Sequence, residues 1–581
     1  MPKKFNFDLI FKKKKISNLL LKKNFFLNNL KNKNYTKNIS IELIGGYTSS
    51  DLSEWIKIFC GNNDITCNLI DSKWGGGFSS IKTIKNNQKN IDFVVLINSW
   101  RDLFPYNNFN NLIYSIDGIV KIFEKFFKQN KSKTIVTTFD YPNFDIDINH
   151  TSLKKIISFL NNEIYRIFSN NINYNIIDEQ YNITSKNIEW QSTRDWHAFG
   201  KIFTNECSIV LAHKIADKIK YSYLSTKKML ILDLDNTIWG GIIGDDGLDN
   251  IKLGDDSAEG RIFNELQSYF KMIKNRGVLL SIVSKNEKNI ALEGLKYNKS
   301  ILKISDFVTT RINWKDKSEN ILSIAKELNL NTSSFVFVDD NPFERDLVKK
   351  KLPDVSVPDI GNYPENYIDI INDYNYFNID GKITKEDLHR TNLYKTEKLR
   401  NKSKKNISNK NFLKSLKIEI EFDNDNKNNL ERIHQLTNKT NQFNLTTERI
   451  QINQIKKFIE NPKKKIIVVN AKDKYGDYGI ISILYATIKK NNLEINNWVM
   501  SCRVFNKTIE HAIIFSIMKK MKKKQLRTLS LTFILSKKNQ LMIDLLKNLG
   551  FVINKKLSTI KSKWILKNNN INHECKIKNE I

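Results

Sequence analysis

One short segment constrains this chain more than any other, because it places two acidic residues directly after a run of apolar residues. Met229–Leu232 is an apolar run of β type, and Asp233 and Asp235 follow it one residue apart. Carboxylates at the end of a buried strand are costly unless a cation lies beside them. Mg²⁺ is the obvious cation, because it is hard and prefers oxygen ligands. A carboxylate beside Mg²⁺ can attack phosphorus, and a second carboxyl group can protonate the leaving oxygen.

Three downstream segments place further polar residues where they could join the same site. The apolar run VLLSIV ends at Ser284, whose hydroxyl can bind a phosphoryl oxygen. Lys317 opens a helical pattern, and its charge can neutralise a nucleophilic carboxylate and a phosphate together. The apolar run FVFV ends in Asp339 and Asp340, which would complete a metal site. Ligands of open α/β sheets collect at the carboxyl ends of the strands, so the order of these segments predicts one phosphoryl-transfer site.

The pattern of Asp233, Asp235 and Thr237 resembles the D-x-D-x-T motif that opens the haloacid dehalogenase (HAD) superfamily. Four segments together resemble its FkbH-like branch, subfamily IIIC: DLDNTIWGGIIGDDG, SIVSKN, RINWKDKSENI and FVFVDDNPFER. Three later segments resemble the region that follows the HAD domain in that family: HQLTNKTNQFNLTTERI, KDKYGDYGIISIL and NNWVMSCRVFNKTIEHAI. The resemblance therefore covers about residues 225–555.

This resemblance implies a Rossmann-like HAD domain over residues 226–375 with Mg²⁺ as its cofactor. The first aspartate of the motif would be the nucleophile and the second the general acid and base. The implied residues are the catalytic Asp233, Asp235, Ser284 and Lys317 and the metal ligands Asp233, Asp235, Asp339 and Asp340.

The spacing of these motifs leaves no room for a cap domain. Between Asp235 and Ser284 the chain has only a glycine-rich flap and one amphipathic helix, Ala258–Asn275. We therefore expect an open, uncapped site that a bulky or protein-tethered substrate can reach.

FkbH-like proteins are linked to the dephosphorylation of 1,3-bisphosphoglycerate and to the loading of its glyceryl unit onto an acyl carrier protein. The resemblance thus implies a phosphatase and acyl (glyceryl) transferase with an acyl carrier protein as partner. Two alternatives stay open. One is a plain phosphatase whose C-terminal domain acts as an acyltransferase in surface-polysaccharide biosynthesis. The other is a noncatalytic scaffold or a nucleic-acid binder that uses the positive charge of the chain.

Residues 39–222 alternate strand and helix patterns, which predicts a parallel sheet. The region resembles an SGNH (GDSL-type) hydrolase domain, and the positions that match its active site are Thr48, Asn98, Asp195 and His197. The segment departs from that family because it lacks Gly-Asp-Ser and because its Asp and His are two residues apart. The Asp and His could instead cap a helix over Ala198–Ala216.

Residues 411–555 resemble a GNAT-type α+β acyltransferase domain. The phosphate cradle of that fold should be a glycine-bearing loop before a helix. The matching segment, Arg503–Thr508, has no glycine, which puts acyl-CoA binding in doubt. Cys502, which follows an apolar run, is either a buried inert thiol or an acyl relay.

Four polar residues of the same region, Gln442, Asn444, Arg449 and Asp477, are unusually dense for a core. Either a functional site or a network of helix caps and turns would explain them.

Composition adds less than the motifs do. The net charge of +32 over 581 residues suggests an acidic partner or surface, but the lysines are scattered and form no arginine-rich or aromatic patch. We therefore expect a solvated basic surface and consider nucleic acid an unlikely partner. Five cysteines without metal-ligand spacing fit a reducing cytoplasm, and no apolar run is long enough to span a membrane.

The predicted architecture is a multidomain α/β protein. Its expected segments are a basic N-terminal arm that lies on other domains or serves as a surface anchor (1–38), the SGNH-like domain (39–222), the HAD domain (226–375), a linker (376–410), the GNAT-like domain (411–555) and a basic tail (556–581).

Overall fold

The computed structural model of the protein describes residues 13–579 except for 32–34, 36, 72–76, 84–90, 105–111, 149–150, 170, 172, 224–225, 378–387, 404–407, 424–425, 427, 441–442, 451, 535–538, 540, 557–558 and 566–570. The chain forms two compact units, Met1–Tyr223 and Leu224–Ile581, which are described separately. No helix among the described residues is both long and apolar enough to cross a membrane.

The first unit is built on a five-stranded parallel sheet in the order β2-β1-β3-β4-β7. Its strands are β1 (Lys37–Ile44), β2 (Ile65–Asp71), β3 (Phe93–Leu96), β4 (Lys133–Thr137) and β7 (Tyr174–Ile177), with a small hairpin of β5 (Asp147–Ile148) and β6 (Thr151–Ser152). Its helices are α1 (Lys13–Leu21), α2 (Lys23–Lys31), α3 (Ser50–Asn62), α4 (Gly77–Thr83), η3 (Trp100–Leu103), α5 (Ile116–Gln129), α6 (Leu153–Phe168), α7 (Gln180–Thr184), α8 (Thr193–Phe199) and α9 (Asn205–Tyr221).

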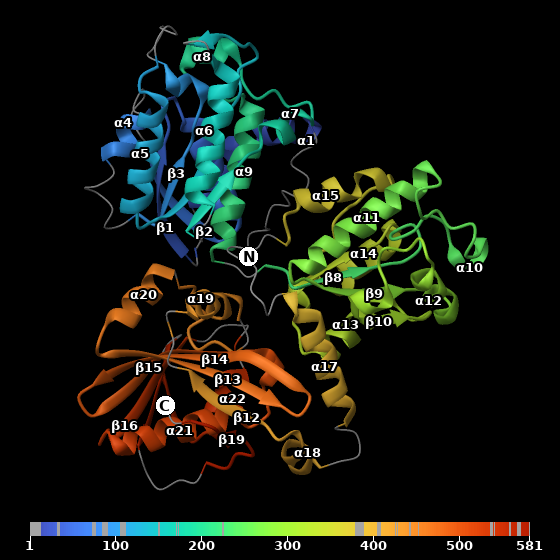
Figure 1. Cartoon of the computed structure of the whole chain (residues 1–581), viewed down its shortest axis with the longest axis vertical. Helices are drawn as coiled ribbons and strands as arrows, with labels where there is room; N and C mark the ends of the chain where they lie inside the picture. Colours follow the sequence, from blue (N-terminus) through green and yellow to red (C-terminus); the bar gives the residue numbers. More distant parts are fainter. Residues whose placement is uncertain are drawn as a thin grey trace. The chain divides into compact units, whose positions relative to one another are not determined.

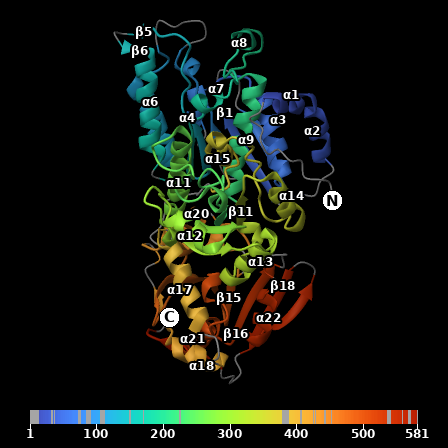
Figure 2. The same ribbon diagram turned by 90° about the vertical axis from the view of Figure 1, so that its right-hand side faces the viewer.

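Two hydrophobic layers cover this sheet, as its near-continuous apolar strands require. Helices α3 and α9 pack on one face, and α4, α5 and α6 pack on the other (Figure 1). The described part of the N-terminal arm lies on the same unit: α1 contacts α9 and α2 contacts α3, with Ile16 and Phe26 buried in the core (Figure 2). Residues 1–12 of the predicted arm lie outside the described residues.

Two local expectations for this unit were wrong or incomplete. The predicted helix over Ala198–Ala216 is interrupted, because α8 ends at Gly200 with a left-handed φ of 63° and α9 begins only after Thr204. Strands β2 and β7 were not predicted. β2 is a half-exposed edge strand, so its sequence lacks a continuous apolar run.

The second unit begins with a four-stranded parallel sheet in the order β10-β9-β8-β11. Its elements are β8 (Met229–Leu232), α10 (Ile243–Asp246), α11 (Ala258–Asn275), β9 (Leu279–Ser284), α12 (Lys288–Lys296), η4 (Ile304–Asp306), β10 (Phe307–Ile312), α13 (Lys317–Leu328), η5 (Thr332–Ser334), β11 (Phe335–Val338), α14 (Pro342–Lys351), η6 (Pro364–Asn366) and α15 (Tyr367–Asp373). Alternate residues of each strand face opposite layers: α11 and α15 cover one face, and α13 and α14 cover the other.

The C-terminal part of this unit is an α+β fold on an eight-stranded sheet in the order β17-β18-β16-β15-β14-β13-β12-β19. Its elements are α18 (Asn409–Leu416), β12 (Glu419–Asp423), α19 (Leu430–Lys439), α20 (Ile452–Glu460), β13 (Lys464–Asp473), β14 (Gly476–Lys489), β15 (Asn492–Met500), η7 (Cys502–Val504), α21 (Ile509–Lys523), β16 (Thr528–Ile534), α22 (Leu541–Asn548), β17 (Val552–Lys556), β18 (Thr559–Ile565) and β19 (Lys576–Ile577). Helices α19 and α20 pack on one face, and α21 and α22 on the other (Figure 1).

The segment expected to be a linker contains a helix, α17 (Arg390–Ser403), which is tied to both parts of the second unit. It contacts β9, β10 and α13 of the four-stranded part. On the other side, the buried guanidinium of Arg400 binds both carboxylate oxygens of Asp473 at 2.7 and 2.8 Å. Glu397 of the same helix accepts two bonds from Lys507, at 2.6 and 2.8 Å.

Candidate active site

The predicted acidic residues meet at the carboxyl edge of the four-stranded sheet. Asp233 directly follows β8, and Asp339 and Asp340 follow β11, which is the neighbouring parallel strand. One carboxylate oxygen of each of these three residues lies within 4.8 Å of the others. The sheet register therefore brings together side chains that are about a hundred residues apart in the chain.

Lys317, the first residue of α13, supplies the cation of this cluster. Its ammonium lies 2.6 Å from Asp339 Oδ2 and 3.1 Å from Asp233 Oδ2. All three side chains are buried. Burial disfavours the charge on Lys317, but the two carboxylates outweigh that effect and raise its pKa above the ordinary value. Burial and repulsion by Asp233 raise the pKa of Asp339 to about 7, although Lys317 opposes this shift.

The residues present fit a divalent cation. Asp233 Oδ1 is buried and has no hydrogen-bond partner, although its neighbour Oδ2 faces Lys317. A buried carboxylate oxygen without a partner is costly and is what a metal ligand or an attacking nucleophile looks like before its partner arrives. Burial and the charge of Asp233 also raise the pKa of Asp340 to about 6, as expected where three carboxylates face one lysine. Hard oxygen ligands of this kind suit Mg²⁺.

Asp235, which the sequence also predicts as a metal ligand, lies outside the group formed by Asp233, Asp339 and Asp340. Three donors from two loops hold its carboxyl group. Its Oδ1 accepts bonds from Trp239 Nε1 at 2.8 Å and from the backbone N–H of Ile243 at 3.2 Å. Its Oδ2 accepts a bond from Asn286 Nδ2 at 2.9 Å. These bonds fix the orientation of the carboxyl group, as a general acid and base requires. Burial raises the pKa of Asp235 despite these donors.

Trp239 and Asn286 were not predicted as site residues. Trp239 is fully buried, and the space beside its ring exists because residue 294 is glycine: a Cβ there would lie 2.9 Å from the indole. Asn286 stands two residues after Ser284, in the SKN segment. The signal for both was their position in loops that follow strands of the sheet, where functional residues concentrate.

We predict that Trp239→Phe lowers turnover about tenfold, because it removes one donor that orients the Asp235 carboxyl group. The measurement is kcat for phosphate release. Trp498→Phe is the matched control, because that buried indole donates to Ser482 in the C-terminal part, away from the acidic site. Equal turnover in the two variants would show that the Trp239 bond plays no part in positioning Asp235.

Two further contacts hold the loop after β11. Thr237 Oγ1 accepts the N–H of Asp340 at 3.2 Å. The buried Arg345 donates to the carbonyl oxygens of Asp339 and Asp340, at 2.9 and 2.6 Å. Ser284 ends β9 at the same edge, as predicted from the apolar run before it, and its side chain is buried.

Residues 226–377 are described without a gap, and they contain no cap domain. The chain between β8 and α11 forms a flap in which Gly240 and Lys252 pair and α10 is the one helix. Gly241 has a φ of 91°, which L side chains rarely adopt, and its N–H binds Asn236. The expected absence of a cap domain therefore holds for these residues.

Comparison with solved structures shows that part of this chain is similar to a protein with a phosphatase domain. The crystal structure of the N-terminal part of protein BF1531 from Bacteroides fragilis, which contains a phosphatase domain complexed with Mg, matches with a TM-score of 0.55 and 25% identity. The match covers 62% of this chain and 99% of that one. It supports a HAD-like phosphatase domain. No family model matches the chain, and neither does any curated protein sequence.

N-acetyltransferases also match, over a smaller share of the chain. The PaiA N-acetyltransferase of Thermoplasma acidophilum in complex with coenzyme A has 13% identity and a TM-score of 0.21, covering 26% of this chain and 99% of that one. The ribosomal-protein-S18-alanine N-acetyltransferase of Escherichia coli has 11% identity and a TM-score of 0.21, covering 27% and 97%.

The four SGNH-like positions lie near the carboxyl edge of the five-stranded sheet but form no triad. Thr48 Oγ1 donates to the carbonyl of Phe199 at 2.8 Å. The side-chain amide of Asn98 donates to the carbonyl of Thr137 at 2.6 Å. Asp195 lies in the first turn of α8 and His197 in its last turn, where it is exposed. Among the described residues, no hydrogen bond joins any two of Thr48, Asp195 and His197.

A different polar group occupies the switch point between β1 and β3, where ligands of such sheets bind. Asp102 is packed against Gly46, where a Cβ would lie 2.1 Å from its Oδ1. Burial raises the pKa of Asp102 to about 7. Arg101 lies between two indole rings, 4.5 Å from the centroids of Trp100 and of Trp196. Sequence reasoning missed these residues because none belongs to the expected motif.

In the C-terminal part, the loop that matches a phosphate cradle is filled by a side chain of the protein. The backbone of this loop is left-handed at Asn506 and Thr508, with φ of 62° and 58°. The N–H of Asn506 donates to Glu510 Oε1 at 2.9 Å, and the Glu510 carboxyl group is buried. A carboxylate at this helix start takes the position that an anionic ligand would need. Acyl-CoA binding at this loop is therefore unsupported.

We predict that this carboxyl group makes the stability of the second unit depend on pH. Burial raises the pKa of Glu510 to about 7, so the folded state holds a proton that the unfolded state loses at lower pH. Stability is then lost as pH rises between about 4.5 and 7. Glu510→Gln should remove this loss and stabilise the protein at pH 8 by up to about 3 kcal/mol. Urea unfolding of the wild type and the variant at pH 5 and pH 8 measures the free energy of unfolding. An equal loss of stability between these pH values in both proteins would contradict this role of Glu510.

The polar residues of the NQFNLTTER segment form a turn network. The buried Asn444 donates to the carbonyls of Thr437 and Thr440 and accepts the N–H of Thr447. Arg449 donates to the same two carbonyls, and burial lowers its pKa to about 10. Asp477 Oδ1 accepts the N–H of Gly479 at the start of β14. Gln442 and the side chain of Cys502 lie outside the described part of the chain.

This segment also occupies the gap where two central strands diverge. β15 and β16 pair only over Asn492–Ile495 and Thr528–Leu531. Beyond that point, backbone bonds join Phe443–Leu445 to Trp498 and Met500 on one side and to Ile534 on the other. The gap is thus closed by the chain itself.

Proposed function

We propose that the protein is a Mg²⁺-dependent HAD-type phosphatase and acyl transferase that dephosphorylates 1,3-bisphosphoglycerate and loads the glyceryl unit onto an acyl carrier protein. The observation that carries the phosphatase part is the buried cluster of Asp233, Asp339, Asp340 and Lys317, in which Asp233 Oδ1 has no partner. The substrate and the carrier rest on the sequence resemblance to FkbH-like proteins.

The proposed phosphoryl step uses residues whose positions are known. Asp233 attacks phosphorus, the bond to the leaving oxygen breaks, and Asp235 gives that oxygen a proton. Water then cleaves the aspartyl phosphate, and Asp235 takes up the proton of the water. Lys317 holds the phosphoryl oxygens and balances their charge. When bound, Mg²⁺ held by Asp233 and by Asp339 or Asp340 supplies further neutralisation of charge on the phosphoryl group.

In the proposed acyl transfer, a thiol accepts the acyl group. 1,3-Bisphosphoglycerate carries an acyl phosphate and a phosphate ester. Attack of a thiol on the acyl carbon forms the thioester and releases one phosphate, and hydrolysis of the ester releases the second. The lack of a cap domain in residues 226–377 supports a tethered substrate, because a cap of that kind would exclude a carrier protein.

The positive net charge of the chain supports an acidic partner, such as a carrier protein, over a neutral partner. Carrier proteins are generally acidic, and a net charge of +32 favours fast, salt-sensitive association with them. Such binding should weaken from low to physiological salt, where the screening length is about 8 Å. Salt-sensitive binding to duplex DNA, with none to the carrier, would contradict this part of the proposal.

The deciding experiment incubates the protein with Mg²⁺, 1,3-bisphosphoglycerate and a carrier protein that bears a pantetheine thiol, and measures the intact mass of the carrier. We expect a glyceryl thioester on the pantetheine. Phosphate release without any loading would instead support a plain phosphatase.

Cys502→Ser separates two routes of acyl transfer. We expect loading to survive this substitution and no acyl adduct to form on Cys502, because the carrier thiol attacks directly. Cys67→Ser is the matched control in the first unit, where this thiol is partly exposed. Loss of loading in Cys502→Ser alone, with phosphate release retained, would establish a relay through that thiol.

A further inference from the structure

A small cavity of about 80 Å³ lies in the second unit, at the opposite end of the four-stranded sheet from the acidic site. Lys228, which lines it, directly precedes β8, and Leu279, which also lines it, is the first residue of β9. The catalytic aspartates follow the last residues of the strands. The cavity is therefore separate from the phosphate position beside Asp233. Its other walls come from α17, α19 and the segment Ser501–Arg503.

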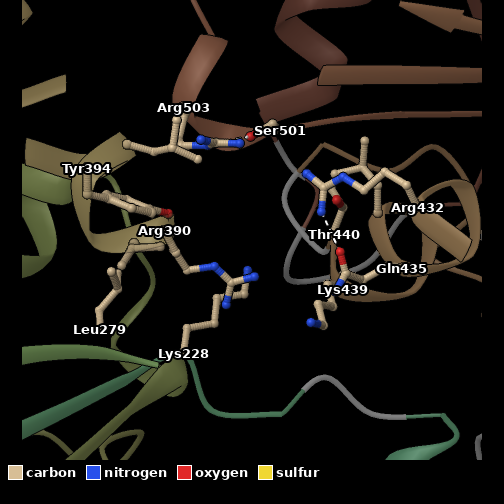
Figure 3. Close-up of a pocket in the computed structure, with 13 residues that line it drawn as sticks. Lys228, Leu279, Arg390, Tyr394, Arg432, Gln435, Lys439, Thr440, Ser501 and Arg503 are labelled. Atoms are coloured by element: carbon tan, nitrogen blue, oxygen red, sulfur yellow. Dashed lines mark hydrogen bonds between the residues drawn. The ribbon is translucent and has the colours of Figure 1, made fainter. Parts of the chain in front are cut away.

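Cationic side chains from four separate segments converge on this cavity. Of the 13 described residues that line it, five are cationic and none is acidic. The five are Lys228, Arg390, Arg432, Lys439 and Arg503. Figure 3 shows the nitrogen-bearing ends of Lys228, Arg390, Arg432 and Lys439 directed into the same space. Gln435, Thr440 and Ser501 add neutral polar groups to the lining.

Helix α19 presents one face to the cavity. Arg432, Gln435, Leu436 and Lys439 are spaced at i, i+3, i+4 and i+7, which places them on a single side of a helix. Arg432 donates to Gln435 on that face, as the dashed line in Figure 3 marks. Arg432 and Lys439 thus both face the cavity because they are seven residues apart, which is about two turns of the helix.

The arginines also make bonds within the protein, and these leave the geometry suited to an anion. Arg390 donates to the carbonyl of Gly277 at 2.8 Å, and Arg503 donates to Ser501 Oγ at 3.3 Å. Arg503 also donates to the carbonyl of Tyr478 at 3.4 Å. A guanidinium has five N–H donors in a planar fork, and two such nitrogens beside this cavity, Arg432 Nε and Arg503 Nη1, are buried and have no hydrogen-bond acceptor among the described residues. Arginine forks match phosphate oxygens in pairs, and buried guanidinium nitrogens without an acceptor are donors that an oxyanion can satisfy.

We propose that this cavity binds a small anion that carries a phosphoryl group. The ligand would hold α19 and η7 against the amino-terminal edge of the four-stranded sheet. A water molecule needs about 10–15 Å³ of such volume, so 80 Å³ accommodates about five to eight atoms of that size, which suits a phosphoryl group. The proposal does not depend on the chemistry at Asp233.

Isothermal titration calorimetry of the full-length protein tests this site, in EDTA so that no divalent cation supports phosphate binding at the acidic cluster. The probes are inorganic phosphate and glycerol 3-phosphate, with sodium chloride at matched ionic strength as the blank. We expect saturable binding of at least one probe and a rise in melting temperature with it. The tighter probe tells whether the natural ligand is free phosphate or a phosphate ester.

The double variant Arg432→Gln, Lys439→Gln should weaken that binding at least tenfold, and Lys439→Gln alone should weaken it less. Lys456→Gln with Lys457→Gln is the matched control, because it removes the same charge from two exposed positions of α20. The control should keep its affinity within twofold. Absence of binding in the wild type, unchanged binding in both α19 variants, or equal loss in the control would overturn the proposal.

Discussion

Asp233→Asn should abolish phosphate release while leaving the fold intact. The amide of asparagine cannot attack phosphorus, and it is nearly the same size as the carboxyl group it replaces. Lys317 keeps its bond to Asp339 at 2.6 Å in this variant, so the cluster does not lose its cation. Removing the group that forms the covalent intermediate should lower turnover by at least about 10³-fold. The measurement is phosphate release from acetyl phosphate and from p-nitrophenyl phosphate in Mg²⁺.

The matched control for this variant is Asp249→Asn, an exposed aspartate between α10 and α11. It changes the same functional group in the same part of the chain and should leave turnover unchanged. EDTA should suppress the activity of the wild type, and excess Mg²⁺ should restore it. Undiminished phosphate release by Asp233→Asn would rule out the proposed nucleophile.

Arg400→Ala should destabilise the second unit by about 3–5 kcal/mol. Arg400 is 2% exposed and binds both oxygens of Asp473. Burial disfavours the charge on Asp473, but Arg400 and Tyr478 outweigh it and hold the pKa of that carboxyl group below its ordinary value. Truncation of the arginine leaves a buried carboxylate without its cation, which is costly. It also removes one of the two described side-chain ties between α17 and the C-terminal part, while the bonds from Lys507 to Glu397 remain.

The matched control is Arg166→Ala in the first unit. Arg166 also binds two carboxylates, Glu124 and Glu163, but its side chain is 54% exposed. Solvent screens exposed ion pairs, so this substitution should leave the urea midpoint of unfolding nearly unchanged. Urea unfolding of both variants measures the difference. Similar values for the two would show that the Arg400 pair contributes no more than a surface pair.

Some elements of the site could be read from local sequence. The runs Met229–Leu232 and Phe335–Val338 and the helix Ala258–Asn275 have the predicted bounds. Short parallel strands buried on both faces are continuous apolar runs, and their carboxyl ends lie at one edge of the sheet. Position along the chain was therefore enough to place Asp233, Lys317 and Asp339 together.

The interruption at Gly200 lay beyond such reasoning. The periodicity of a helix extends over Ala198–Ala216, but one left-handed residue ends α8 and redirects the chain before α9. Strands β2 and β7 were missed because half-buried strands carry a weaker apolar signal. Tertiary pairing with β1 and β4 stabilises them.

What the sequence by itself determined is the set of acidic and basic groups at the strand ends, because strand length and alternation are local properties of the chain. What only the tertiary structure decided is which loops approach each other. The hydrogen bonds to Asp235 come from Trp239 and Asn286, which lie in different loops. The cationic residues of the cavity come from four segments between residues 228 and 503. Such contacts depend on how layers pack, and packing is a property of the folded chain as a whole.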